Sequence, residues 1–296
     1  MLGTSLTFDV PCSWGSVETI KTKTLPDKIF FQSSLPRVGS TVFQNLMNQD
    51  PRFYASSTSG MLELIYAARH NYTESPEFKA QDTELMKKAF MGFCREGIHG
   101  YYAAITDKQY VMDKSRGHFA HYGFIDSFYP NPKIICLVRA LPDVIASMEK
   151  MFRNNQHKSH AIVNHASMQG TSTPKRVDIW FNSPPIGLAI ERLGEAIRQG
   201  IDKKLLFIKY ESLCLYPEME MKRVYEYLEI EPFQHDFTHI EQTTKEDDEV
   251  YGLAGLHTIR PSLEMKPSDA REVLGKDVYD GIMNHYKWYN DYFGYK

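Results

Sequence analysis

The strongest constraint on the fold is an alternation of short apolar runs with amphipathic helical segments along most of the chain. The clearest run, PKIICLV at 132–138, is dense in β-branched residues and predicts a strand buried on both faces. Further strands are predicted at 28–35, 52–56, 109–113 and 203–210, and helices at 40–49, 59–70, 77–102, 117–129, 142–152, 177–199, 217–228 and 278–293. This order favours an α/β fold, a parallel sheet flanked by helices.

Composition limits the partners and the compartment. The formal net charge of −3 over 296 residues creates no global basic field, so we expect neither nucleic acid nor membrane as a partner, and any anion site must be built locally. The four cysteines are far apart and form no C-x-x-C pair, and the start lacks the features of a signal peptide. No apolar stretch approaches the length of a membrane span. We therefore expect a cytoplasmic protein with a single domain over 1–296.

The turn after the first strand carries the first candidate site. In LPRVGST, Arg37, Gly39, Ser40 and Thr41 join a buried strand to a helix, and every polar group there can donate a hydrogen bond. The helix N-terminus adds unpaired amides that suit an anion. Ordinary turn chemistry explains the same residues equally well. The Walker P-loop pattern is absent, although Ser40 or Thr41 could hold Mg²⁺ if a carboxylate partner existed.

A second basic position favours the anion-site interpretation. Arg139 ends the strand at 132–138, and Ser147 lies in the second turn of the next helix. Ligands of doubly wound sheets bind beyond the carboxyl ends of the strands, so both turns open on the same edge. Two donor groups facing one cleft indicate a ligand with two phosphate-type groups.

These stretches together resemble the sulfotransferase superfamily. LPRVGST is similar to its 5′-phosphosulfate-binding loop, and RALPDVIAS is similar to its 3′-phosphate-binding segment. VMDKSRGH stands where the family has a lysine, and the YESL stretch at 210–213 resembles its Y-E-[DS]-L segment. The order and spacing of these motifs match the family from about 28 to 230. They resemble the bacterial and tyrosylprotein branch more than the cytosolic small-molecule branch. The resemblance implies a P-loop-NTPase-like sulfotransferase fold.

The resemblance also implies the chemistry. The donor would be 3′-phosphoadenosine 5′-phosphosulfate (PAPS), and 3′-phosphoadenosine 5′-phosphate (PAP) would be the product of an in-line sulfuryl transfer to a hydroxyl or amine. The amides of 38–41, including that of Val38, would hold the 5′-phosphate, and Arg37 and Lys114 would stabilise the leaving oxygen. Arg139 and Ser147 would bind the 3′-phosphate, with Tyr210 and Arg260 as further candidate contacts. No metal is required in this scheme.

Departures from the family pattern leave the acceptor base open. Val38 replaces a hydroxyl residue, and Val42 stands where cytosolic members often carry an adenine-stacking tryptophan. The histidine of the family's K-T-H sequence is missing, because Lys114 is followed by Ser115 and Arg116. His118 and Glu63 are the candidate bases, with His157, His160 and His165 as further choices. The acceptor itself, whether small molecule, glycan or tyrosine peptide, is not specified.

The polar segment 153–176 has few apolar positions to anchor it, so we expect either a lid over the acceptor pocket or a plain surface loop. Two other functions remain open. One is a P-loop-type nucleotide-dependent kinase, which would need a Walker lysine and carboxylates for Mg²⁺. The other is a non-catalytic nucleotide-binding protein that has lost its base.

Overall fold

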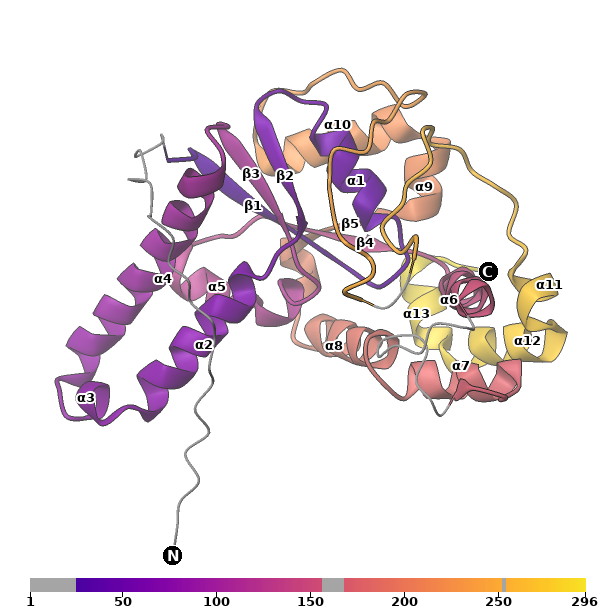
Figure 1. The fold of residues 1–296 in the computed structure, drawn as a ribbon, viewed down its shortest axis with the longest axis horizontal. Coiled ribbons are helices and arrows are strands. Elements are labelled where there is room, and N and C mark those ends of the chain that lie inside the picture. Colours follow the sequence, from indigo (N-terminus) through magenta and orange to yellow (C-terminus); the bar gives the residue numbers. More distant parts are fainter. Residues whose placement is uncertain (1–24, 156–167, 252–253) are drawn as a thin grey trace, which may run out of the picture.

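The computed structural model describes residues 25–155, 168–251 and 254–296, which fold around one parallel sheet. The strands lie in the order β2–β3–β1–β4–β5, and all four pairs are parallel. Their bounds are β1 Lys28–Ser34, β2 Phe53–Thr58, β3 Tyr110–Lys114, β4 Ile134–Val138 and β5 Leu205–Lys209. Every predicted strand is present, and the α/β class with helices flanking a parallel sheet is confirmed (Figure 1).

The helices follow most of the predicted segments. Their bounds are α1 Ser40–Met47, α2 Met61–Glu74, α3 Pro76–Lys79, α4 Thr83–Ile105, α5 Tyr122–Phe128, α6 Leu141–Asn154, α7 Thr173–Phe181, α8 Ile186–Arg198, α9 Tyr210–Leu215, α10 Pro217–Leu228, α11 Ala270–Leu274, α12 Lys276–His285 and α13 Lys287–Phe293. Single 3₁₀ turns precede α5 and β5. The strands β1 and β4 are buried almost throughout, because helices cover their apolar side chains on both faces of the sheet (Figure 1).

Three long predicted helices are each two helices. The segment 177–199 is broken between α7 and α8 by Pro184 and Pro185, because a proline in a helix interior lacks the N–H that the helix needs. The segment 77–102 is divided into α3 and α4, and 278–293 bends at Tyr286 between α12 and α13. The first break was readable from its two prolines, whereas Tyr286 gives no such signal.

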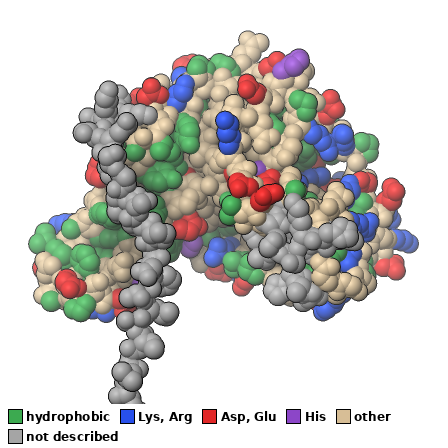
Figure 2. Space-filling view, viewed as in Figure 1, with side chains coloured by type: hydrophobic (Ala, Val, Ile, Leu, Met, Phe, Trp, Pro, Cys, Tyr) green, Lys and Arg blue, Asp and Glu red, His purple; other side chains and the backbone are tan. Residues whose placement is uncertain are grey.

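Helices α2, α3 and α4 form an arm that extends away from the sheet (Figure 1). Apolar side chains are visible on this arm in the space-filling view (Figure 2), and its exposed residues include Leu64, Leu85 and Phe93. The arm root is buried, however, since Cys94, Ile98 and Tyr102 of α4 belong to the core. The arm therefore holds α2 in place beside the carboxyl edge of β2 and β3.

Several other predictions can be placed in the fold. Cys136 is fully buried in β4 as expected, and Cys94 and Cys214 are also buried free thiols, while Cys12 lies outside the described residues. Within the described residues, no helix has both the length and the apolar character needed to cross a bilayer. The predicted lid or loop at 153–176 begins in the last residues of α6 and ends within α7, and its middle part 156–167, with His157, His160 and His165, lies outside the described residues.

Candidate active site

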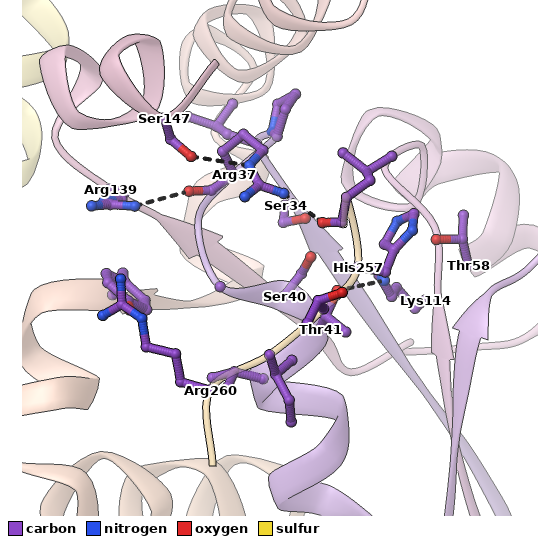
Figure 3. Close-up of a pocket in the computed structure, with 18 of the residues that line it drawn as sticks. Ser34, Arg37, Ser40, Thr41, Thr58, Lys114, Arg139, Ser147, His257 and Arg260 are labelled. Carbon is purple, nitrogen blue, oxygen red and sulfur yellow. Dashed lines mark hydrogen bonds between the residues drawn. The ribbon is translucent and has the colours of Figure 1, made fainter. Parts of the chain in front are cut away.

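A cavity of about 280 Å³ opens at the carboxyl edge of the sheet, where β1, β3 and β4 end (Figure 3). We call it the first cavity. It is lined by every residue of the predicted donor site except Val38, namely Arg37, Gly39, Ser40, Thr41, Lys114, Arg139, Ser147, Tyr210 and Arg260. The fold thus brings together residues that are up to 223 positions apart in the chain, from Arg37 to Arg260.

The turn between β1 and α1 has an unusual backbone. Arg37 has φ 61° and Gly39 has φ 85°, both in the left-handed region that costs free energy for most side chains. A Cβ at Gly39 would lie 2.5 Å from Cδ2 of Tyr210, so the ring closes directly over the glycine. Val38 is fully buried and belongs to the core. The turn therefore needs glycine at 39, and its valine at 38 serves packing.

Arg37 is held across the first cavity by two hydrogen bonds. Its Nε donates to Ser147 Oγ at 3.1 Å, and its Nη1 donates to the carbonyl of Leu256 at 2.5 Å. Burial lowers the pKa of Arg37 to about 10, and the neighbouring positive charge of Arg139 adds to this effect. Both causes disfavour the charged form, so an anion beside Arg37 would be bound strongly because it relieves the repulsion.

Arg139 is fixed from both sides. Its guanidinium lies 4.8 Å from the ring centroid of Tyr210 and donates to the carbonyl of Arg37 at 3.3 Å. The carbonyl of Arg139 accepts a hydrogen bond from the Tyr289 hydroxyl at 2.8 Å. Glu211 accepts from the amide of Ala140 at 2.9 Å, at the start of α6. The YESL stretch thus positions the arginine, with Tyr210 in the first cavity and Glu211 in a structural role.

Residues 256–264 line the mouth of the first cavity and contribute Arg260, and residues 240–251 lie beside them. The stretch 240–251 is tied to the polar face of α1, where Asn45 Oδ1 accepts from the amides of Thr243 and Thr244 at 2.6 and 3.0 Å. Gln242 then accepts from the amide of Ile259 at 3.1 Å, linking the two stretches. Asn45 is buried, so these contacts hold both stretches at the site.

Lys114, at the end of β3, forms an ion pair inside the site. Its Nζ lies 3.2 Å from Oε1 of Glu246 and 3.3 Å from Oγ1 of Thr41. Burial lowers the pKa of Lys114, although the Glu246 carboxylate opposes that shift. For Glu246, burial would raise the pKa, but the positive charge of Lys114 and the amide of Thr58 outweigh it and lower the pKa. The pair therefore stays ionised and keeps the lysine beside the α1 turn.

His257 continues this network. Its Nε2 lies 3.2 Å from Glu246 Oε2, and its Nδ1 lies 2.6 Å from Asp248 Oδ1. Burial lowers the pKa of His257, and the hydrogen bond with Asp248 only partly offsets this. A neutral imidazole with Nδ1–H directed at Asp248 has Nε2 as its proton acceptor, and Glu246 Oε2 lies 3.2 Å from that nitrogen, so this carboxylate must move aside before an acceptor hydroxyl can reach it. His257 lines both the first cavity and a second cavity beside it.

A second cavity of about 340 Å³ adjoins the first and shares its boundary residues Thr58, Ser115, Arg116 and His257. Glu63, one of the predicted bases, lies on α2 and lines this second cavity, where its side chain is exposed. The two cavities thus meet at His257, which is where a donor group and an acceptor group would face each other.

The expectation that His118 reaches the cleft is wrong. His118 is fully buried, and its Nε2 lies 2.8 Å from Asp113 Oδ2 beneath the sheet edge. Its ring packs against Phe31 with centroids 5.0 Å apart, and Tyr102 donates a hydrogen bond to the same aspartate. The physical reason is the tight turn after Lys114, which carries His118 back into the core. It stabilises the fold at the end of β3.

Sequence reasoning missed Glu246, Asp248 and His257, and the second cavity as a whole. The only available signal was the acidic run at 246–249 followed by LHTIRP at 256–261, and such a run alone is typical of a solvated surface. Among the described residues, no group of three or more His, Cys, Asp or Glu side chains could hold a metal ion.

Comparison with known proteins gives the class. The profile described as "Sulfotransferase family" matches residues 30–235, well over half of the chain, so the chain belongs to the sulfotransferase family. That membership supports sulfotransferase activity in general. None of the curated proteins matches the sequence.

Similar solved structures include sulfotransferases, and the first one named here supports the fold. The sulfotransferase domain from the curacin biosynthetic pathway has 16% sequence identity and a TM-score of 0.51, covering 90% of this chain and 99% of that one. Retinol dehydratase, solved with androsterone and PAP, has 16% identity and a TM-score of 0.48, covering 92% and 82%. Sulfotransferase STF9 from Mycobacterium avium has 13% identity and a TM-score of 0.46, covering 91% and 76%.

Proposed function

We propose that the protein transfers a sulfuryl group from PAPS to a hydroxyl or amine acceptor. The observation that carries this proposal is the cluster of four cationic side chains around the α1 turn, namely Arg37, Lys114, Arg116 and Arg139. The positive charges of Arg139 and Arg116 lower the pKa of Arg37, after burial, and Arg116 acts on Lys114 in the same direction. Clustered like charges are costly unless a polyanion occupies the site. PAPS is such a polyanion, because its ribose carries phosphate groups at both the 3′ and the 5′ position.

Each side chain has a defined role in the proposed reaction. Arg139 and Ser147 bind the 3′-phosphate, and the amides at the start of α1 bind the 5′-phosphate. The acceptor oxygen attacks sulfur while the bond from sulfur to the phosphate oxygen breaks. Lys114 and Arg37 stabilise the negative charge left on PAP. Catalysis comes from position and charge, as in phosphoryl transfer.

The proton of the acceptor needs a base, and we assign it to His257. Its Nε2 lies at the boundary of the two cavities, and Asp248 holds the opposite nitrogen at 2.6 Å. Glu246 can assist, since it lies beside both His257 and Lys114. His257 therefore replaces the missing histidine of the K-T-H sequence, and the proton moves from the acceptor hydroxyl to Nε2. Glu63 lies in the second cavity as an alternative base.

The test is transfer of ³⁵S from labelled PAPS to a panel of phenols, alcohols, amines, glycans and tyrosine peptides, with products identified by mass spectrometry. We expect a sulfated product in wild type and none in Lys114→Ala. In parallel, PAP should raise the melting temperature more than adenosine 5′-phosphate does. Stabilisation by ATP–Mg²⁺ alone would support the kinase instead. PAP binding without transfer to any acceptor would support the non-catalytic protein.

A further inference from the structure

The second cavity carries one positive charge, that of Arg192, which the proposed sulfuryl transfer does not use. It lies between α2, the turn after β3, α8 and the segment that carries His257. Two arginines line it: Arg116 from the turn and Arg192 from α8. Arg116 also borders the first cavity, whereas Arg192 lines the second cavity and is not among the residues that line the first. Arg192 is therefore the arginine that belongs to the second cavity alone.

Within the described parts of the chain, neither guanidinium has a hydrogen bond or a close ion pair, although the Glu246 carboxylate acts on Arg116 from a distance. Arg192 is half-buried and has therefore lost part of its hydration, and no described carboxylate pairs with it to offset that loss. Arg198, on the same helix, differs from Arg192 in this respect, because it pairs with Glu195 at 2.6 Å.

The wall of the second cavity beside Arg192 is neutral and does not cancel the charge of the arginine. Burial lowers the pKa of His121 to about 4, and the charge of Arg192 contributes further, so the imidazole is neutral at pH 7 and cannot itself bind an anion by charge. The hydroxyl of Tyr66 hydrogen-bonds Nδ1 of His121 on the same wall. Among the described residues that line the second cavity, Glu63 is the one carboxylate, and it is solvent-exposed and pairs with neither arginine.

We infer that the acceptor carries, besides its hydroxyl or amine, an anionic oxyacid group, that is a carboxylate, sulfate or phosphate, which Arg192 and Arg116 bind. This rests on the proposed function and names the acceptor class. A planar guanidinium offers paired N–H donors that match two oxyacid oxygens. With the anionic group held by Arg192, the hydroxyl lies toward His257 and the first cavity. The rings of Tyr66 and Tyr251 line the space between and suit an apolar or aromatic body.

The test compares acids with their own methyl esters, which lack the negative charge and are larger by one methyl group. Protein saturated with PAP is titrated by calorimetry with 4-hydroxyphenylacetate and with 3-hydroxybutyrate, and with the methyl ester of each. We expect at least one acid to bind about tenfold or more tightly than its ester, since hydrogen bonds to charged groups are worth about 1.5–3 kcal/mol. Arg192→Gln should remove the preference, and Arg192→Lys should keep part of it.

Arg198→Gln is the matched control, because it removes an exposed arginine from the same helix and should leave the preference unchanged. The inference is overturned if neither acid binds more tightly than its ester, or if Arg192→Gln leaves the preference intact. Binding of PAP is measured first in the same protein. If PAP fails to bind, the proposed function fails, and an Arg192-dependent preference in the nucleotide-free protein would still support the anion site.

Discussion

The first and second cavities meet at one edge of the sheet but are assembled in different ways. The first is built mainly from turns that directly follow β1, β3 and β4, so its groups sit close to their strands in sequence. The second is built from α2, α8, the turn after β3 and the segment near His257, which converge only in the folded chain. The residues of the first cavity can therefore be recognised from short sequence motifs, whereas those of the second cavity come together only through tertiary packing.

The largest expected effect separates the first cavity from the rest of the molecule. Arg37→Ala should lower sulfate transfer by about 10²–10⁴-fold, because its bidentate guanidinium would make two charge-assisted hydrogen bonds of about 1.5–3 kcal/mol each to the donor. The free energy of unfolding should change little, since the guanidinium bonds to Ser147 and to one carbonyl only. Turnover and chemical denaturation are measured together, with Arg198→Gln as the control. Near-wild-type turnover in Arg37→Ala would remove this turn from the chemistry.

The next prediction contrasts His118, which the sequence offered as a candidate base, with His257, which sequence reasoning missed. His257→Gln should reduce turnover by about 10²–10⁴-fold with a small change in stability, as expected for a general base. His118→Gln should cost about 1–3 kcal/mol of stability, because it disturbs a buried polar pair with Asp113, while the folded protein keeps its turnover. If His118→Gln instead lost turnover while His257→Gln kept it, His118 would be the base and the assignment to His257 would be wrong.

The same base predicts a pH dependence. The pKa of His257 is lowered by burial, so its deprotonated form persists to a pH below the ordinary value of about 6.5 for histidine. We expect kcat/KM to fall as the pH decreases through this lowered pKa, giving an acid limb with its midpoint below 6.5. His257→Gln should have no such limb. An acid limb above 6.5 in wild type would contradict a buried neutral imidazole as the base.

How far the sequence could predict the site follows from these contrasts. Arg37, Arg139 and Ser147 could be predicted because each lies at a short, fixed offset from a buried strand, and Lys114 because its stretch matches the family's lysine. Arg192 and His257 were not, since nothing within a few residues of either shows that α8 and the segment after α10 converge on one cavity. The prediction for His118 was wrong for the same reason. Its position just after β3 could be predicted, but the tight turn that directs it into the core could not.

A smaller effect tests which end of the nucleotide Arg139 reads. Arg139→Ala should weaken PAP by about 10–100-fold, for the loss of one charged contact, and weaken adenosine 5′-phosphate much less. Calorimetric titration of both nucleotides measures the difference. Equal losses for the two would mean that Arg139 does not bind the 3′-phosphate. Its stacking on Tyr210 would then serve only the fold.

The smallest effect concerns the backbone of the turn. Gly39→Ala should lower stability by about 1–3 kcal/mol and also weaken PAP, because a left-handed φ of 85° and a contact of 2.5 Å with Tyr210 are both imposed on the new methyl group. Gly200→Ala is the control, with φ 72° and open space around the Cβ, so it carries the backbone cost alone. Equal losses of stability, with PAP binding unchanged in both variants, would show that the Tyr210 ring moves away from the new methyl group at no cost in free energy.

The most direct measurement is a crystal structure of the protein with PAP. The account predicts the 3′-phosphate against Arg139 and Ser147, the 5′-phosphate against the first amides of α1, and Lys114 within hydrogen-bonding distance of the phosphate oxygen that would carry the sulfuryl group. The sulfuryl position would then point at His257 and the second cavity. A nucleotide bound outside the first cavity, or bound there in the opposite orientation, would contradict the central claim that these cations bind PAPS for transfer.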